Sequence, residues 1–207
     1  MSTRMAKAKP RMRKLPAQAR SRATVDAIVE AAARILSDQG WAGFTTNKVA
    51  EAAGVSIGSY YQYFPDKHSL IEAIRDRHLD DCLAGLARAT AGKKPLATFV
   101  GELIDTIVAM HSIHPGLHRV LLDEAPSPEG FRDPESEFEK AYLGYFRRAV
   151  STYAARAGRM PEEASAMILS DAIDGVIHNA ARRGTLQNPD VRNELVRMIE
   201  AYMEDLP

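Results

Sequence analysis

The chain has 207 residues, enough for one large domain or two small ones. Its 45% hydrophobic and 26% charged residues are typical of a globular protein and exclude a disordered one. No apolar run approaches the roughly 20 residues of a membrane span, and the basic N-terminus lacks the apolar segment of a secretory signal. Cys82 is the only cysteine, which excludes an internal disulfide and a thiolate zinc cluster and favours a cytoplasmic protein.

The formal net charge is zero, but the charge is unevenly distributed. Residues 1–22 carry eight Lys or Arg and no acidic residue, whereas residues 23–70 carry five acidic and three basic residues. The remainder of the chain therefore has an excess of six acidic residues. A basic N-terminal segment followed by an acidic remainder indicates that the N-terminal part binds a polyanion.

The first predicted elements are a basic arm and a helix. Residues 1–20 are rich in Lys, Arg, Ala and Pro and are predicted to be disordered. Residues 21–39 repeat apolar side chains at helical spacing, and Gly40 is expected to end that helix. Trp41 and Phe44 follow, and we expect their rings to pack beneath the next segment.

The next segment, TTNKVAEAAGVSIGSYYQYF at residues 45–64, predicts two short helices around a tight turn. Thr46 is expected to cap the first helix and Ser56 the second, with Gly54 in the left-handed conformation between them. The second helix carries hydroxyls, phenols and an amide, whereas a core helix would be aliphatic and a solvated one charged. Such groups bond to phosphates and base edges, so the pattern favours a helix that reads the DNA major groove over an ordinary bundle helix.

The rest of the chain predicts helices only. Asp66 is expected to cap a helix over about 66–91, which links the first part to the rest. Further helices are predicted over 96–113, 116–124, 136–157, 161–183 and 189–204, with a Pro- and Gly-rich loop at 125–135. The predicted fold class is all-α, with an N-terminal three-helix helix-turn-helix domain at 21–68 and a C-terminal helical domain at 92–207.

Residues 25–74 resemble the N-terminal domain of the tetracycline-repressor family of bacterial transcription regulators. The segments GVS, YYQYF and PDKHSL occur in the order and spacing of that family. The resemblance covers about a quarter of the chain, and the remainder matches only in being helical and of suitable length. It implies a sequence-specific transcription regulator, most often a repressor, whose C-terminal helical domain binds a ligand and dimerises.

The resemblance also implies roles for single residues. Thr46, Tyr61 and Lys67 are expected to contact phosphates. The residues expected at or near base edges are Asn47, Ile57, Gly58, Ser59 and Tyr63. Gln62 is open to either role, and the expected DNA-binding set also includes Ser56.

Two features of the N-terminal part leave questions open. Tyr60 stands where the family usually has an aliphatic residue, so its phenol must either bury its ring with the hydroxyl reaching out or tilt the helix. The helix-turn-helix itself contains few cationic residues. The basic arm is therefore a candidate for additional contacts with DNA in a neighbouring minor groove. The arm residues in question are Arg11, Arg13, Lys14, Arg20 and Arg22.

A single helix-turn-helix touches few base pairs, so we expect a two-fold homodimer on a near-palindromic operator of double-stranded DNA. The last two predicted helices mix small and aliphatic residues, which suits a four-helix bundle between subunits. Packing within one subunit is the alternative. The candidate interface residues are Ala164, Ile168, Ala172, Gly175, Val191, Leu195, Met198 and Tyr202.

The resemblance implies a ligand cavity, and an unknown apolar or aromatic effector that shifts the spacing of the two reading helices. The candidate lining residues are Met110, His111, His114, Phe138, Tyr142, Phe146, Met167 and His178, all of which would serve equally as core. His111, His114 and His118 are a possible metal-binding set, but Pro115 separates the last from the others, so no metal and no cofactor are expected.

Two rival functions were considered. An enzyme is not expected, because the chain contains no nucleophile elbow, phosphate loop, HExxH or paired-cysteine motif. A DNA-binding architectural or activating protein without a ligand is the other rival. An internal cavity in the C-terminal part would favour the ligand-responsive regulator over that rival.

Overall fold

A computed structural model describes residues 12, 16–125, 136–156 and 163–205. The described part is helical throughout and contains no strand, which confirms the predicted fold class. Its elements are α1 (Ala19–Gly43), α2 (Thr46–Ala52), α3 (Ile57–Tyr63), α4 (Lys67–Ala89), α5 (Leu96–Ile113), α6 (Leu117–Arg119), the π-helical turn η1 (Val120–Glu124), α7 (Glu137–Arg156), α8 (Glu163–Arg182) and α9 (Pro189–Glu204). Most of the predicted arm lies outside the described residues, as does nearly all of the loop predicted at 125–135.

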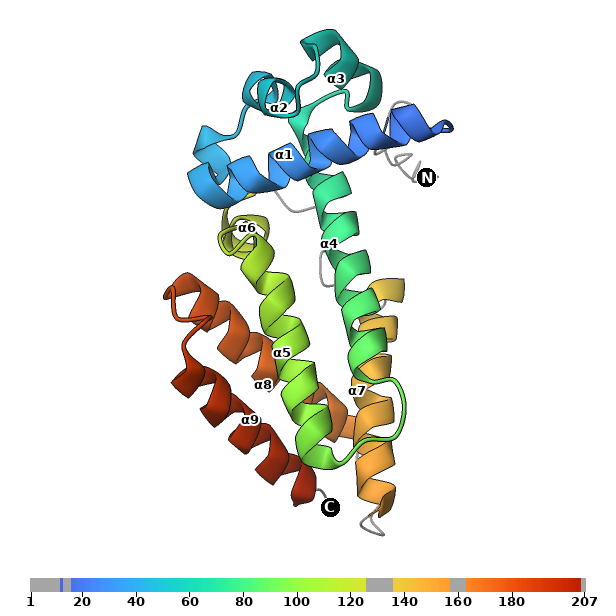
Figure 1. Ribbon diagram of the computed structural model, residues 1–207, viewed down its shortest axis with the longest axis vertical. Helices are drawn as coiled ribbons and strands as arrows, with labels where there is room; N and C mark the ends of the chain where they lie inside the picture. The colour runs from blue at the N-terminus through green and yellow to red at the C-terminus, as the bar shows by residue number, and fades with distance from the viewer. Residues whose placement is uncertain (1–11, 13–15, 126–135, 157–162, 206–207) are drawn as a thin grey trace, which may run out of the picture.

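The molecule is elongated, with two parts joined by α4 (Figure 1). Helices α1, α2 and α3 lie together at one end and form, with the start of α4, what we call the N-terminal unit. Helix α4 runs from this unit along α5 and α7 into the helical body, where α8 and α9 lie on the far side of α5. The two parts have separate hydrophobic cores.

The segment after α5 packs with the N-terminal unit although it lies far from it in sequence. Leu117, Val120 and Leu121 of α6 and η1 belong to the same buried cluster as the apolar face of α1. Two short elements from the middle of the chain thus complete the core of the N-terminal unit. Movement of α5 and α6 therefore acts on α1 directly, as well as through α4.

Helix α5 corrects the expectation that no apolar segment approaches a membrane span. Over its 18 residues the mean hydropathy is 1.4, so by length and composition alone it passes as a spanning helix, the one such helix in the described part of the chain. In this fold it is a core helix, packed between α4 on one side and α8 and α9 on the other. Its buried residues are Phe99, Val100, Leu103, Ile104, Ile107 and His111.

Candidate nucleic-acid interface and effector cavity

The first helix of the helix-turn-helix is capped by Thr45, not by Thr46 as predicted. The Thr45 Oγ1 accepts a hydrogen bond of 3.3 Å from the backbone N–H of Lys48. Thr46 is instead the first helical residue, and its Oγ1 lies 3.2 Å from the Tyr61 hydroxyl oxygen. Because two adjacent threonines offer the same capping group, the sequence alone could not choose between them. The shift leaves the Thr46 hydroxyl beside Tyr61.

The turn between α2 and α3 follows the prediction. Gly54 has a φ of 67°, a conformation that costs glycine little and other residues much more. Ser56 then caps α3, since its Oγ accepts the N–H of Ser59 at 3.0 Å. Asp66 caps α4 in the same way, accepting the N–H of Ser69 at 2.8 Å. The starts of α3 and α4 are thus fixed by local chemistry.

The outer face of α3 is open. Ile57 is 39% exposed and Tyr61 40% exposed, and Gly58 and Gln62 are also exposed. Asn47 of α2 is exposed, while Ser59 is half-buried with its Oγ 2.9 Å from that of Ser56. In Figure 1, α2 and α3 lie at the end of the molecule opposite α9, so no other described helix covers this face.

The inner face of α3 carries two phenols. Tyr60 is fully buried, and its hydroxyl donates to the Asp66 carbonyl oxygen at 3.4 Å. The ring is therefore buried, as in the first of the two alternatives, but the hydroxyl bonds to a backbone carbonyl instead of reaching out. Burial raises the pKa of Tyr60 far above its ordinary value, so the phenol stays neutral. Tyr63 is only 8% exposed, so packing accounts for most of its side chain, and its contact with a base edge stays a prediction.

The two lysines of the unit are both held by neighbouring groups. The Lys48 Nζ donates to Gln39 Oε1 at 2.8 Å and to the Gly43 carbonyl at 3.0 Å, which ties α2 to the end of α1. The Lys67 Nζ lies 3.8 Å from the centroid of the Trp41 ring. Trp41 therefore has the structural role predicted for it, and it also places the Lys67 charge at the N-terminus of α4.

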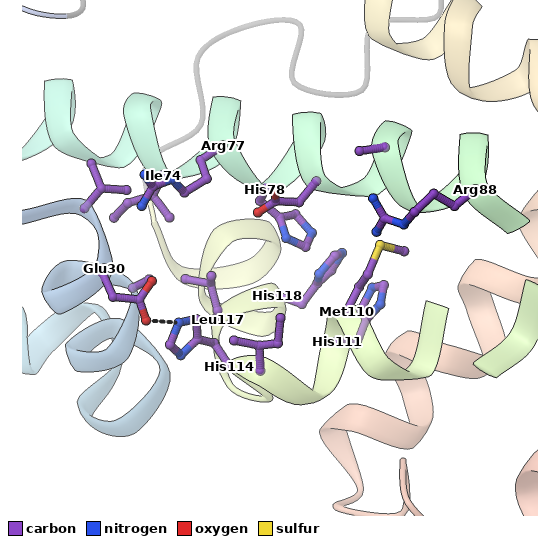
Figure 2. A pocket seen from close by; sticks show the side chains of 15 residues that line it. Glu30, Ile74, Arg77, His78, Arg88, Met110, His111, His114, Leu117 and His118 are labelled. Carbon is purple, nitrogen blue, oxygen red and sulfur yellow. Dashed lines mark hydrogen bonds and ion pairs between the residues drawn. The ribbon is translucent and has the colours of Figure 1, made fainter. Parts of the chain in front are cut away.

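A cavity of about 280 Å³ lies where the N-terminal unit meets the body (Figure 2). Its wall combines apolar residues of α1 and α4 with histidines and charged residues. The lining residues from α1 and α4 are Val29, Glu30, Ala33, Ile74, Arg77, His78, Asp81, Ala84 and Arg88. Those from α5 to α6 are Met110, His111, Ile113, His114, Leu117 and His118.

Three of the eight predicted pocket residues line this cavity: Met110, His111 and His114. Tyr142 and Phe146 lie instead in the core of the body, with Phe138 packed against them. The Tyr142 hydroxyl donates to Asp174 Oδ1 at 2.7 Å, which anchors α7 to α8. Met167 is 50% exposed on the outer face of α8. His178 lies behind the cavity, with its ring centroid 5.4 Å from that of His111.

Sequence reasoning missed the most concentrated feature of this region, a cluster of histidines from four elements. His78, His111 and His118 each offer one ring nitrogen, and these three atoms lie within 4.8 Å of one another. His178 of α8 stacks against His118 at a centroid distance of 4.1 Å. His114, the third member of the set weighed from sequence, points away, and its Nε2 lies 3.1 Å from Glu30 Oε1 (Figure 2).

Burial sets the charge state of this cluster. Burial and, to a smaller extent, the neighbouring imidazoles of His111, His178 and His114 together lower the pKa of His78 to about 4. Burial also lowers the pKa of His111, although its hydrogen bond to the Ile107 carbonyl and the charge of Asp174 act in the opposite direction. Both imidazoles are therefore neutral near pH 7.

Three polar contacts join α6 and η1 to the N-terminal unit. The Gly116 N–H donates to Ser37 Oγ at 3.1 Å, and the Trp41 N–H donates to Glu124 Oε2 at 3.0 Å. The buried Arg75 of α4 donates to the Leu121 carbonyl at 3.2 Å. The cavity is thus bordered by the same elements that hold α1 and α4 in place.

Helices α8 and α9 present an exposed apolar face. Ile168 is 51% exposed and Met198 43% exposed, and Ala164 and Gly175 are also exposed. Ala172, Val191 and Tyr202 are half-buried. Leu195, predicted to lie in the interface, is only 3% exposed and packs in the core of the body, although it also borders a shallow apolar groove along α9.

Comparisons with known proteins agree with this architecture. The profile described as bacterial regulatory proteins, tetR family, matches residues 28–74, and the one described as Tetracyclin repressor-like, C-terminal domain, matches residues 95–203. A putative TetR-family regulator from Rhodococcus sp. superposes with a TM-score of 0.67 at 22% identity, covering 87% of this chain and 98% of that one. A TetR-family regulator from Streptomyces coelicolor gives 0.58 at 21% identity, covering 89% and 99%.

A curated relative is the nucleoid occlusion factor SlmA of Actinobacillus pleuropneumoniae serotype 5b (strain L20), 33% identical over 90 residues. The match covers 43% of this chain and 44% of the relative, so the chain spans less than half the length of this curated protein. The C-terminal profile alone covers more than half of the chain. The chain therefore belongs to the tetR family of bacterial DNA-binding transcription regulators, a family of regulators and not of enzymes.

Proposed function

We propose that the chain is a homodimeric repressor that binds a near-palindromic operator in the cytoplasm and is released by a small apolar or aromatic effector. The observation that carries the DNA-binding part is the outer face of α3, where Ile57, Gly58, Tyr61 and Gln62 are exposed at one end of the molecule. The relative named nucleoid occlusion factor matches less than half of the chain, so its role is not part of this proposal.

The proposed DNA contacts divide into residues that bind phosphates and residues that contact base edges. Thr46 and Tyr61 present two hydroxyls 3.2 Å apart, which suits a single phosphate, and Lys67 adds charge at the N-terminus of α4. Gly58 lets the backbone approach the bases closely. The proposed base-edge residues are Asn47, Ile57 and Ser59, with Ser56 and Gln62 at the border of the two groups.

The basic arm is proposed to strengthen DNA binding through a neighbouring minor groove. Arg20 and Arg22 are exposed at the start of α1, while Arg11, Arg13 and Lys14 lie outside the described residues. Deleting residues 1–19 should lower both the affinity for DNA and its dependence on salt, because each phosphate contact that is lost reduces the number of counterions released on binding. Unchanged binding would dismiss this role.

The exposed apolar face of α8 and α9 is proposed as the dimer interface. Ile168 and Met198 would be buried between subunits, and the small residues Ala164 and Gly175 would allow the helices to approach closely. Met167, expected to line a pocket, lies on this same exposed face. Two subunits joined here would hold their α3 helices at a fixed separation.

The cavity of about 280 Å³ is proposed as the effector site. It borders α1 and α4, so an occupant that changes their position relative to α5 would change the separation of the two α3 helices. The effector would act by favouring a separation that does not fit the operator. The cavity also favours this proposal over a regulator without a ligand, for which no cavity would be needed.

Selection of bound DNA from a random pool tests the proposal. We expect an enriched near-palindrome, and we expect some small apolar or aromatic compounds to release it. Enrichment of a single half-site would contradict the dimer. Enrichment of a palindrome that no compound releases would favour the regulator without a ligand.

A further inference from the structure

The histidine cluster beside the cavity has a geometry that the effector proposal does not use. His78 comes from α4, His111 from α5 and His118 from α6, and Figure 2 shows the three rings pointing into one space. One ring nitrogen of each lies within 4.8 Å of the others. In a tetrahedral site with metal–nitrogen distances of about 2.0–2.1 Å, ligand nitrogens lie about 3.3 Å apart. Small side-chain rotations would close that gap.

The two ring nitrogens of His111 have different surroundings. Its Nδ1 lies 2.8 Å from the Ile107 carbonyl oxygen, which can only accept, so Nδ1 carries the proton. The other nitrogen, Nε2, therefore has a lone pair, and it is buried without a hydrogen-bond partner among the described residues. A backbone carbonyl that orients one nitrogen while the other faces a shared space is the arrangement usual for a metal-binding imidazole.

We propose that His78, His111 and His118 bind a divalent late transition-metal ion, of the class of Zn²⁺, Co²⁺ and Ni²⁺. Neutral imidazole is the preferred nitrogen ligand of these ions in proteins. All three histidines line the cavity, so a fourth coordination position would face it and take water or a small ligand.

The charge state of the cluster supports the site. Burial lowers the pKa of His111, so that its imidazole is neutral near pH 7 and need not lose a proton to bind a cation. The cluster also lies near the Asp174 carboxylate, whose negative charge acts on His111. A cation is therefore compensated on the side of α8.

The site would link metal binding to the position of the N-terminal unit. His78 lies 11 residues into α4, about 17 Å along the helix from its start beside α3. His118 follows Gly116, whose N–H bonds to Ser37 of α1. An ion that draws α4, α5 and α6 together would therefore shift both supports of the unit. This coupling rests on the proposed function, whereas the metal site itself does not.

Metal titration of the full chain, prepared without a polyhistidine tag, tests the site. We expect one Zn²⁺ per chain, measured by competition with a chromophoric chelator, and visible absorption bands when Co²⁺ replaces it. His118→Ala should lower the affinity by at least the 10- to 100-fold that loss of an outer partner typically costs. His114→Ala is the matched control, since it removes a histidine from the same cavity whose ring bonds Glu30 instead.

The possible outcomes test metal binding and its coupling to operator binding separately. Absence of Zn²⁺ and Co²⁺ binding, or equal affinity in His118→Ala, would overturn the site; His78→Gln provides a second test should His118→Ala misfold by circular dichroism. If Zn²⁺ changes operator affinity by some factor, operator DNA must change Zn²⁺ affinity by the same factor. Metal binding without that reciprocal change would overturn the coupling alone. Failure to bind any DNA, with or without metal, would overturn the proposed function, and the metal titration would still test the site.

Discussion

Ser59 and Tyr61 are two residues apart on α3 and therefore point in different directions from its axis. Tyr61 pairs with Thr46 at the flank of the helix-turn-helix, whereas Ser59 lies half-buried beside the cap at the helix start. A residue at the flank suits a phosphate, and one at the start of a reading helix suits a base edge.

Substitution of each hydroxyl should separate these roles. Tyr61→Phe should weaken binding to all sequences by a similar factor, because a phosphate contact carries no sequence information. Ser59→Ala should change the preference at one operator position by about 1–3 kcal/mol and leave the rest unchanged. The Ser56 cap survives in Ser59→Ala, since Ser56 accepts the backbone N–H of residue 59. Binding curves over a set of single-base operator variants provide the measurement, and equal effects from the two substitutions would contradict the division.

The buried histidines should make the metal-free protein less stable in mild acid. The pKa of His78 is about 4 in the folded chain and 6.5 when unperturbed, so between these values the unfolded state binds more protons. The contribution of His78 to the free energy of unfolding is fully present above pH 6.5. It falls by up to about 3 kcal/mol as the pH drops toward 4. The groups that face it include His111 and His118, whose ring centroids lie 5.9 and 4.6 Å from that of His78, and Cys82, whose Sγ lies 3.7 Å from its Nε2.

Thermal unfolding in the presence of a chelator checks this prediction. We expect the melting temperature to fall between pH 7 and pH 5, and His78→Gln should flatten that fall by removing the buried titrating group. His68→Gln is the control, because that histidine is exposed in the N-terminal unit. An identical pH profile for His78→Gln and the unsubstituted chain would contradict the assignment.

At the scale of elements, the residue before α6, Gly116, lies very close to the backbone of α1. A Cβ on Gly116 would lie 2.2 Å from the Ser37 carbonyl oxygen, which is backbone and cannot rotate away. The φ of Gly116 is −81°, so any residue could adopt its conformation and only space requires glycine. The close approach is what lets Leu117 and Val120 enter the core of the N-terminal unit.

Gly116→Ala should therefore destabilise the protein by about 1–3 kcal/mol, the usual cost of an overpacked contact. Urea unfolding measures this cost directly. Gly101→Ala in α5 is the matched control, because its Cβ would have only Arg192 within reach, at an ordinary 3.8 Å. Alanine is also the better helix former, so Gly101→Ala should be neutral or stabilising by up to about 1 kcal/mol. Equal destabilisation by the two substitutions would show that α6 tolerates displacement from α1.

The elements that sequence predicted well are those governed by local chemistry. Ser56, Asp66 and Gly54 each act on residues within one turn, so their roles at helix ends could be inferred without knowing the fold. The choice of Thr46 over Thr45 as the cap was wrong, because neighbouring threonines are chemically equivalent as caps.

The predictions that depended on long-range packing fared worse. The apolar spacing of Tyr142 and Phe146 indicated a buried face but not its partner, which proved to be the core of the body and not the cavity. The histidine cluster joins α4 to α5 and α6 and reaches α8, and nothing local to His78 or His178 indicates that they meet. His111 and His114 looked paired by helical spacing, yet their rings point in different directions (Figure 2).

At the scale of the whole molecule, the junction between the N-terminal unit and the body would link the two proposed binding events. The N-terminal unit meets the body through α4 and through α6 with η1, and the cavity lies between these supports. The proposed reading helix α3 lies at one end of the molecule, whereas α8 and α9 lie in the body (Figure 1). A change of angle at the junction would therefore be amplified into a change of distance between the two α3 helices of a dimer.

That geometry matters only if α8 and α9 join two subunits, which a single charge can test. Ile168→Glu would place a carboxylate in the centre of the proposed interface, where an unpaired buried charge costs several kcal/mol. We expect the dimer dissociation constant to rise by about 100-fold or more, which corresponds to about 3 kcal/mol. Sedimentation equilibrium measures it. Operator affinity should fall with it, because each half-site would then be bound independently.

Ile113→Glu is the matched control for this test. Ile113 is 69% exposed, but it lies at the end of α5 beside the cavity and not on the face of α8 and α9. It should stay dimeric at concentrations where Ile168→Glu is monomeric, and its melting temperature should be similar. If Ile168→Glu remains a dimer and keeps its operator affinity, the subunits associate through another surface. The spacing of the two α3 helices would then be set by contacts other than those of α8 and α9.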